Sequence, residues 1–150
     1  MAEVVPILPD LSDNIQFGNS LISQTELNGI NGANHQIMEI APFDWNTINN
    51  GCGFDVIIGN PPYVNTEGMH ALLPSAEVEV YKKKYKTSHK QFDKYFIFIE
   101  QAINKIKETG LVCYIVPNKF FKIGAGEKLR NLIAKERMLV SCLLYTSPSP

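Results

Sequence analysis

The chain has 150 residues, of which 45% are apolar, and this is enough for one packed domain. Lysine and arginine number 14 against 15 aspartates and glutamates, so the formal charge is −1. This balance excludes an overall basic field that would attract nucleic acid or an anionic membrane, and any contact with DNA must be local.

The cysteines and the N-terminal residues indicate the environment of the protein. Cys52, Cys113 and Cys142 lack the close spacing of a zinc site, and an odd number makes a poor disulfide framework. Residues 1–11 carry two acidic residues and two prolines where a signal peptide needs positive charge and an apolar stretch. The apolar runs are much shorter than the roughly 20 residues of a membrane-spanning helix. We expect a reduced, cytoplasmic protein without a bound metal or a membrane partner.

The first third of the chain has two different patterns. Residues 14–22 form a short apolar segment, which predicts a strand that runs into a turn at Gly18 and Asn19. Residues 23–53 are rich in asparagine and glycine, with a local apolar patch around Trp45. We interpret residues 23–53 as a loop-rich surface insertion around one packed anchor.

A buried strand followed by a rigid loop comes next. Residues 54–59 are a nearly continuous β-branched run, which is typical of a parallel strand covered on both faces. The sequence Asn60-Pro61-Pro62-Tyr63 ends this strand, because proline has no ladder donor and restricts the residue before it to extended conformations. We call these four residues the 60–63 loop and expect it at the carboxyl end of the strand.

The remaining chain alternates between helix and strand. Residues 65–91 are polar and charged, and we expect a second loop-rich, flexible insertion there. Residues 93–109 place apolar side chains at helical spacing and close at Gly110, which predicts an amphipathic helix. Residues 111–116 predict a second buried strand, and residues 126–136 predict a second helix.

The order strand, helix, strand, helix predicts an α/β fold, namely part of a doubly wound, Rossmann-like domain with a mostly parallel sheet. Because right-handed crossovers are nearly obligatory in such units, the strands at residues 54–59 and 111–116 should lie parallel, with the first helix across one face. Ligands in this architecture bind just beyond the carboxyl ends of the strands. Asn60 and Pro117 then lie at the functional edge of the sheet.

The 60–63 loop combines two hydrogen-bond acceptors with an aromatic ring. An aromatic amino group is planar and a poor nucleophile until acceptors draw its hydrogens aside. The side-chain oxygen of Asn60 and the backbone carbonyl of Pro61 can each accept one such hydrogen, and Pro62 helps to fix their separation. The Tyr63 ring offers a stacking surface, worth about 1–3 kcal/mol, to a base rotated out of a duplex. A merely structural double proline is the alternative, but it rarely ends a buried strand.

The motif Asn60-Pro61-Pro62-Tyr63 after a buried strand resembles the catalytic motif of S-adenosylmethionine-dependent amino-methyltransferases. Over residues 14–133 the chain resembles the adenine-specific DNA class of restriction–modification systems. The resemblance implies methyl transfer from S-adenosylmethionine to the exocyclic amino group of a flipped adenine in double-stranded DNA. It also implies a fused or associated restriction nuclease. A protein glutamine methyltransferase shares the motif and is the alternative enzyme, and a non-catalytic remnant or interaction module is the alternative outside enzymes.

Three residues are candidate cofactor contacts through this resemblance. Asn19 stands where the family has a polar residue that contacts the adenine of the cofactor, and Asp44 is the competing candidate. A turn-forming role for Asn19 is an equally good interpretation. Phe98 matches a helix position that packs on the cofactor's adenine ring, although its periodicity is equally typical of a core residue.

Three further residues are candidate DNA contacts. Asn118 and Lys119 lie in a Val-Pro-Asn stretch that in the family borders the pocket for the target base. Lys83 belongs to a run of lysines at residues 82–86 that would suit phosphates, although charged runs are more often solvated faces.

Part of the family pattern has no counterpart in the sequence. Family members carry, before the first strand, a Gly-rich loop for the methionine part of the cofactor and an acidic residue for its ribose, and residues 1–13 match neither. We therefore assign residues 1–141 to a partial catalytic domain with little or no activity alone. Residues 142–150 form an unmatched tail that we place outside the native structure.

Overall fold

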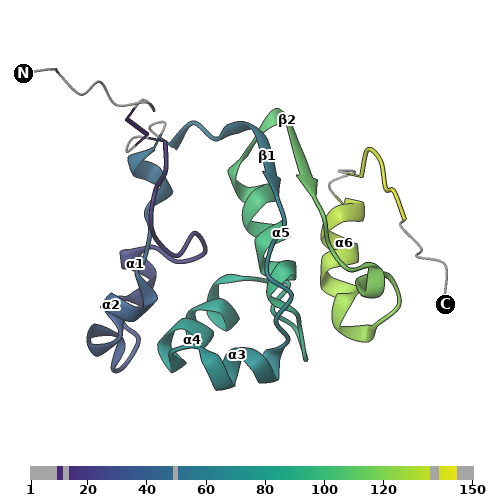
Figure 1. Cartoon of the computed structure of the whole chain (residues 1–150). Coiled ribbons are helices and arrows are strands. Elements are labelled where there is room, and N and C mark those ends of the chain that lie inside the picture. The colour runs from purple at the N-terminus through teal and green to yellow at the C-terminus, as the bar shows by residue number, and fades with distance from the viewer. Residues whose placement is uncertain (1–9, 12–13, 49–50, 136–138, 145–150) are drawn as a thin grey trace, which may run out of the picture.

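The computed structural model describes residues 10–11, 14–48, 51–135 and 139–144 of the chain. It confirms the α/β fold. The sheet has two parallel strands, β1 (Phe54–Gly59) and β2 (Ile106–Tyr114), and helix α5 (Lys94–Lys105) lies between them in the chain. Figure 1 shows the two strands side by side with α5 along them, and helix α6 (Glu127–Lys135) on the other side of β2. The parallel strand–helix–strand unit is therefore as predicted.

Short helices occupy most of the segment before β1. They are α1 (Gln24–Leu27), η1 (Ala33–His35), α2 (Ile37–Ile40) and η2 (Trp45–Thr47). The interpretation of residues 23–53 as an insertion with one packed anchor is too simple, because this segment buries several side chains, namely Leu27, Ile30, Ala33 and Ile40. These side chains join the main hydrophobic core.

The strand predicted at residues 14–22 is wrong. The segment forms only an isolated parallel bridge between Asn19 and Pro42. Its backbone is held by single hydrogen bonds instead of a continuous strand ladder: the Asn19 amide donates to the carbonyl of Ala41 over 2.6 Å, and the Phe43 amide donates to the carbonyl of Ile22 over 2.8 Å. The indole of Trp45 also donates to the carbonyl of Ser20 over 2.8 Å. Of the apolar residues that suggested a strand, Leu21 and Ile22 are buried in the core, whereas Ile15 and Phe17 are 70% and 91% exposed.

The segment between β1 and α5 is helical, so the expectation of a flexible loop at residues 65–91 is wrong. It forms α3 (Thr66–Leu72), which begins after the side-chain cap Asn65, and α4 (Ser75–Lys84). The buried face of α4 includes Glu77, whose carboxylate accepts a hydrogen bond from Tyr81 and pairs with Lys94 at 3.2 Å. A buried charged residue interrupts the apolar pattern, and this is why the sequence did not indicate a helix.

The boundary between α5 and β2 also differs from the prediction. The helix ends at Lys105 instead of residue 109, and Gly110 lies within the strand instead of closing the helix. A Cβ atom at Gly110 would lie 2.8 Å from the carbonyl oxygen of Phe54, so glycine allows β1 to approach closely. The pairing register shifts at this point, since Phe54 pairs with Ile106 but Val56 pairs with Leu111.

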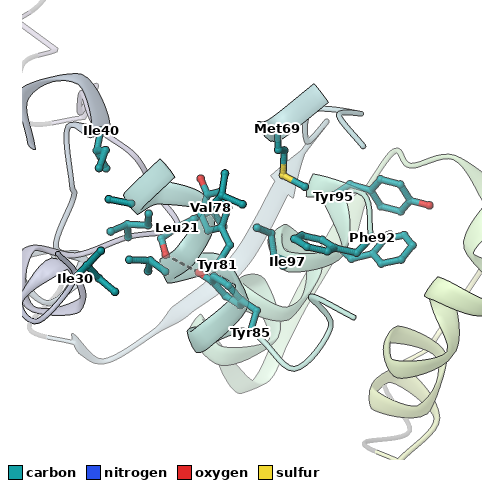
Figure 2. Packing of buried hydrophobic residues seen from close by; sticks show 14 of the residues in the cluster. Leu21, Ile30, Ile40, Met69, Val78, Tyr81, Tyr85, Phe92, Tyr95 and Ile97 are labelled. Atoms are coloured by element: carbon teal, nitrogen blue, oxygen red, sulfur yellow. Dashed lines mark hydrogen bonds between the residues drawn. The ribbon is translucent and has the colours of Figure 1, made fainter. Parts of the chain in front are cut away.

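The hydrophobic core lies between α4, α5 and the segment before β1 (Figure 2). The largest fully buried side chains include those of Leu21, Met69, Tyr81, Phe92, Tyr95, Phe96 and Ile97. Figure 2 also shows the Tyr85 hydroxyl, which donates to the carbonyl of Leu21 over 2.7 Å. Every buried side-chain nitrogen and oxygen in the described residues has a hydrogen-bond partner.

The sheet is less covered than the sequence predicts. Val56 and Ile58 of β1 are 55% and 77% exposed, and Leu111 of β2 is 58% exposed. The expectation of strands covered on both faces is therefore wrong for the chain as described. The reason is that α5 packs beside β2, while no described element covers Val56 and Ile58.

Two short 3-10 helices follow β2, η4 (Asn118–Phe121) and η5 (Gly124–Gly126), and α6 confirms the helix predicted near residues 126–136. Residues 1–9 and 145–150 lie outside the described part of the chain, so the assignment of the tail stays a prediction. In the described part, no helix has the length and apolarity needed to cross a membrane. Likewise, the described His, Cys, Asp and Glu residues form no group of three that could hold a metal ion.

Candidate catalytic site at the strand ends

The 60–63 loop leaves the carboxyl end of β1 with its chemical groups accessible. Asn60 and Pro62 are exposed, and Tyr63 keeps 49% of its surface exposed, whereas Pro61 is buried. The Tyr63 hydroxyl lies within hydrogen-bonding distance of the Asn60 side-chain oxygen, and 2.8 Å from the carbonyl oxygen of Ile115. A hydroxyl has one proton, so it donates to one of these acceptors at a time.

The aromatic ring of Tyr63 is supported from α5. Its edge meets the ring of Tyr95, with the centroids 6.1 Å apart and the planes at 89°. The Tyr95 hydroxyl donates to the carbonyl of Pro117 over 3.2 Å. Burial, and then the nearby charge of Asp93, raise the pKa of Tyr95 above its ordinary value, so it remains a neutral donor. The 60–63 loop is thereby connected to the end of β2.

The start of α5 holds the far end of the loop. Asn65 and Asp93 form an antiparallel bridge, and the Lys94 amide donates to the carbonyl of Val64 over 2.7 Å. The Thr66 hydroxyl also donates, over 2.8 Å, to the carbonyl that directly precedes Asp93. We call this set of contacts the neck. It fixes the chain directly after Tyr63 although α3 and α4 intervene in sequence.

A cavity of about 450 Å³ borders the loop. Its size lies within the range of roughly 300–1,000 Å³ that small-molecule sites occupy. Residues from four parts of the chain line it, among them Asn60, Pro61 and Pro62 from the loop, Val56 and Ile58 from β1, Phe98, Gln101 and Lys105 from α5, and Ser20 and Trp45 from the segment before β1.

The lining of this cavity suits a flat aromatic group. Phe98 and Trp45 contribute rings, and β1 contributes aliphatic side chains. Among the described residues that line it, Lys105 is charged and none is acidic. The adenine part of S-adenosylmethionine therefore fits these residues, whereas its ribose hydroxyls and ammonium group find no carboxylate among them.

The three predicted cofactor residues lie in different places. Phe98 lies on the cavity wall and is partly buried. Asn19 does not line the cavity: its side-chain oxygen accepts from the Leu21 amide over 3.1 Å, and its nitrogen donates to Tyr81 over 3.3 Å. Asp44 is exposed and caps η2 by accepting from the Asn46 amide. The turn-forming interpretation of Asn19 describes its contacts in this structure.

Sequence reasoning missed the cavity residues next to these candidates, Ser20 and Trp45. The signal for Trp45 was present, since it is the only tryptophan and lies in a local apolar patch. Its ring packs edge-on against Phe54 at the start of β1, with centroids 5.3 Å apart. This contact places it beside the strand that ends in the 60–63 loop.

The three predicted DNA contacts also differ in their surroundings. Asn118 is exposed directly after Pro117. Lys119 is half-exposed, and its Nζ lies 3.0 Å from Oδ1 of the buried Asp93. Lys83 lies on the surface of α4, where it pairs with Glu79 at 2.7 Å. The structure thus brings Asn118 and Lys119 to the strand ends and places Lys83 on a solvated helix surface.

Comparison with known proteins identifies the family. The model of the Eco57I restriction-modification methylase family matches residues 8–148. The chain belongs to this family. Eco57I-family membership confirms the resemblance to methyltransferases of restriction–modification systems, and it favours this group over protein glutamine methyltransferases.

Individual relatives agree with the Eco57I-family assignment. The type II restriction enzyme and methyltransferase RM.Eco57I of Escherichia coli is 46% identical over 142 residues, which cover 95% of this chain and 13% of that protein. The type II methyltransferase M.BstVI of Geobacillus stearothermophilus is 36% identical over 98 residues, 63% of this chain and 17% of that protein. A putative type II restriction enzyme and methyltransferase of Methanocaldococcus jannaschii, RM.MjaORFECS2P, is 35% identical over 109 residues, 70% of this chain and 8% of that protein. The chain spans less than a fifth of the length of these relatives.

Proposed function

We propose that an Eco57I-family protein carrying this chain transfers a methyl group from S-adenosylmethionine to the exocyclic amino group of adenine in DNA. The observation that carries the proposal is the arrangement of the 60–63 loop: Asn60 is exposed, Tyr63 is 49% exposed, and the loop borders a cavity lined by aromatic residues. Family membership supports a DNA methyltransferase, and the chemistry of the loop supports an amino group as the methyl acceptor.

Asn60 and Pro61 would bind the hydrogens of the target amino group. An amide oxygen has two lone pairs, so the Asn60 oxygen can accept from Tyr63 and still accept from adenine. The backbone carbonyl of Pro61 is the second acceptor, and burial fixes the ring of this proline. Two acceptors in place before the reaction stabilise the pyramidal nitrogen of the transition state more than the planar ground state.

Phe98 and Trp45 would hold the adenine ring of S-adenosylmethionine against the aliphatic side chains of β1. The bound cofactor supplies an electrophilic methyl group on sulfur. Tyr63 would stack on the flipped target base, which replaces part of the stacking lost from the duplex. Asn60 is not basic, so its role is to orient the amino group, and the proton that the nitrogen loses on methylation would pass to solvent at this exposed loop.

DNA and a nuclease are the partners in this proposal. With a formal charge of −1, the chain provides only local contacts for double-stranded DNA. Asn118, which is exposed shortly after β2, is the polar residue that we propose for such a DNA contact. The names of two relatives combine restriction enzyme and methyltransferase, and a restriction nuclease in the same polypeptide is part of our proposal for this protein.

The test is methylation of duplex DNA by an intact family protein carrying this sequence, with Asn60→Ala as the variant. Loss of one hydrogen-bond acceptor for the transition state should lower kcat about 10²–10³-fold. Folding should not change, because Asn60 is exposed. Asn104→Ala, an exposed asparagine on α5, is the matched control and should keep full activity.

The product identifies the substrate. When the methyl group of S-adenosylmethionine carries an isotopic label, mass spectrometry of the digested DNA should find this label on the amino nitrogen of adenine. Label on cytosine would contradict adenine specificity, and labelled protein with unlabelled DNA would overturn the assignment to DNA.

A further inference from the structure

A buried carboxylate lies between the two loops that follow the strands. The side chain of Asp93 is 5% exposed, and Nζ of Lys119 lies 3.0 Å from its Oδ1. Asp93 directly precedes α5, in the neck beside the 60–63 loop, whereas Lys119 lies in η4. We call residues 117–123 the 117–123 loop. The ion pair therefore joins this loop to the chain segment that holds the 60–63 loop.

The Asp93 carboxylate does not cap α5, although Asp93 directly precedes this helix. Aspartate before a helix ordinarily accepts a hydrogen bond from a backbone amide of the first turn. Asp93 is the N-cap residue of α5, but its side chain makes no such bond, and the Phe96 amide bonds to its backbone carbonyl. Its bridge to Asn65 fixes the backbone, so the carboxylate is held facing Lys119.

The 117–123 loop is rigid around Lys119. The amides of Lys122 and Ile123 donate to the Lys119 carbonyl over 3.0 and 3.1 Å. The next side chain, Phe120, is buried, and Gly126 packs so closely on its carbonyl that no Cβ atom would fit there. Because the loop is rigid, a displacement of Lys119 also displaces the neighbouring residues of the loop.

We propose that Asp93 and Lys119 are positioning residues for methyl transfer, and that Lys119 is not a phosphate contact; this inference rests on the proposed function. The ion pair holds the 117–123 loop against the start of α5. Tyr95 donates to Pro117 in this loop and supports the ring of Tyr63. A displaced loop therefore moves the ring on which the target base stacks.

The cost of breaking the pair argues against a DNA contact. Moving Lys119 to a phosphate would leave the Asp93 carboxylate buried without its partner, and an uncompensated buried charge is strongly unfavourable. Lys122, on the same loop, is exposed and lacks an ion pair among the described residues, so it is the lysine that is free to meet a phosphate.

The experiment compares Asp93→Asn, Lys119→Met and the double variant in an intact family protein carrying this sequence. Each single variant should lower kcat about tenfold while KM for DNA stays within about twofold, because geometry and not affinity is lost. The double variant should be no slower than the slower single variant, because both substitutions remove the same contact. The dependence of DNA binding on salt should be unchanged in Lys119→Met.

A phosphate contact would give the opposite result. Lys119→Met would then raise KM for DNA and reduce the salt slope by about 1, while Asp93→Asn would leave kcat unchanged. That outcome overturns the inference. Lys128→Met, at an exposed lysine of α6, is the matched control for the loss of one charge and should keep the wild-type kcat.

Two further variants keep the test decisive. If Asp93→Asn does not fold, Lys119→Arg is compared with Lys119→Met: a fast Arg variant beside a slow Met variant supports the positioning role, and equal kcat values overturn it. Asn60→Ala separates the two proposals. Full activity of Asn60→Ala contradicts the proposed function, whereas an inactive Asn60→Ala with wild-type kcat in Asp93→Asn and Lys119→Met contradicts the positioning role alone.

Discussion

The helical core and the two-stranded sheet are packed in opposite ways. In the helical core, Tyr81, Tyr95 and Phe96 are fully buried. On the sheet, Val56 and Ile58 are 55% and 77% exposed. The 60–63 loop lies where the two regions meet. The sheet sets the direction of this loop, and contacts with α5 hold it in place. Because the core is buried and the face of β1 is exposed, we expect the free energy of unfolding to depend on the core and hardly at all on the open face of β1.

The largest expected effect is on the core. Phe96→Ala should lower the free energy of unfolding by about 3–5 kcal/mol, because the lost side chain is fully buried and leaves a cavity. Urea unfolding followed by circular dichroism measures this change. The control is Phe17→Ala, since Phe17 is 91% exposed. A loss below about 1 kcal/mol for Phe96→Ala would show that the core is loosely packed.

A smaller loss is expected for the buried carboxylate of Glu100, which accepts from the Lys86 amide and from the amide and hydroxyl of Thr87 at 2.8–3.0 Å. Glu100→Ala should cost about 1–3 kcal/mol, because it leaves these donors without an acceptor. The same unfolding experiment applies. Glu79→Ala removes a surface ion pair and should cost about 0.5 kcal/mol or less. Equal losses of unfolding free energy in Glu100→Ala and Glu79→Ala would contradict the expectation that the buried carboxylate contributes more.

The third expectation concerns alkaline pH. Burial, and then the charge of Glu77, raise the pKa of Tyr81 above its ordinary value of 10.0. In the unfolded chain the pKa is ordinary, so above about pH 10 the unfolded state loses this proton first and stability falls. The contribution is fully present below this pH and declines by about 1.4 kcal/mol per pH unit above it. Tyr81→Phe should therefore show a shallower decline in unfolding free energy between pH 10 and about pH 11, and equal slopes would argue against the effect.

The smallest effect is expected on the open face of the sheet. Ile58→Ser should change the free energy of unfolding by about 0.5 kcal/mol or less, because Ile58 is 77% exposed. Ile97→Ser, at a fully buried isoleucine of α5, is the matched contrast and should be much more damaging. A loss above about 1 kcal/mol for Ile58→Ser would show that another part of the protein covers this face in solution.

The elements that the sequence predicted correctly are those with an uninterrupted local pattern. β1 contains an uninterrupted β-branched run at residues 56–58, and α5 repeats its apolar residues at helical spacing. α4 was missed because Glu77 on its buried face is neutralised by Lys94, a partner from another helix. No local pattern can indicate that a charge is buried in this way, because the compensating group comes from the tertiary structure.

In the candidate site, too, features with a local sequence pattern could be predicted, and features that depend on tertiary contacts could not. The position of the 60–63 loop at the end of β1 could be predicted, because its four residues are consecutive and directly follow a strand pattern. The Asp93–Lys119 pair could not, since its members are 26 residues apart and their contact depends on two loops meeting at the strand ends. The same holds for Trp45, which is placed at the cavity by tertiary contacts, namely its ring packing on Phe54 and its hydrogen bond to Ser20.

The neck has a consequence for how such proteins diversify. The chain leaves the 60–63 loop at Val64 and comes back at Lys94, and the two positions are joined by a backbone hydrogen bond of 2.7 Å. Everything between them, α3 and α4 included, is thus a detour whose two ends are tied together. This segment can change in length or sequence while the 60–63 loop stays in place, so we expect it to vary among members of the Eco57I family.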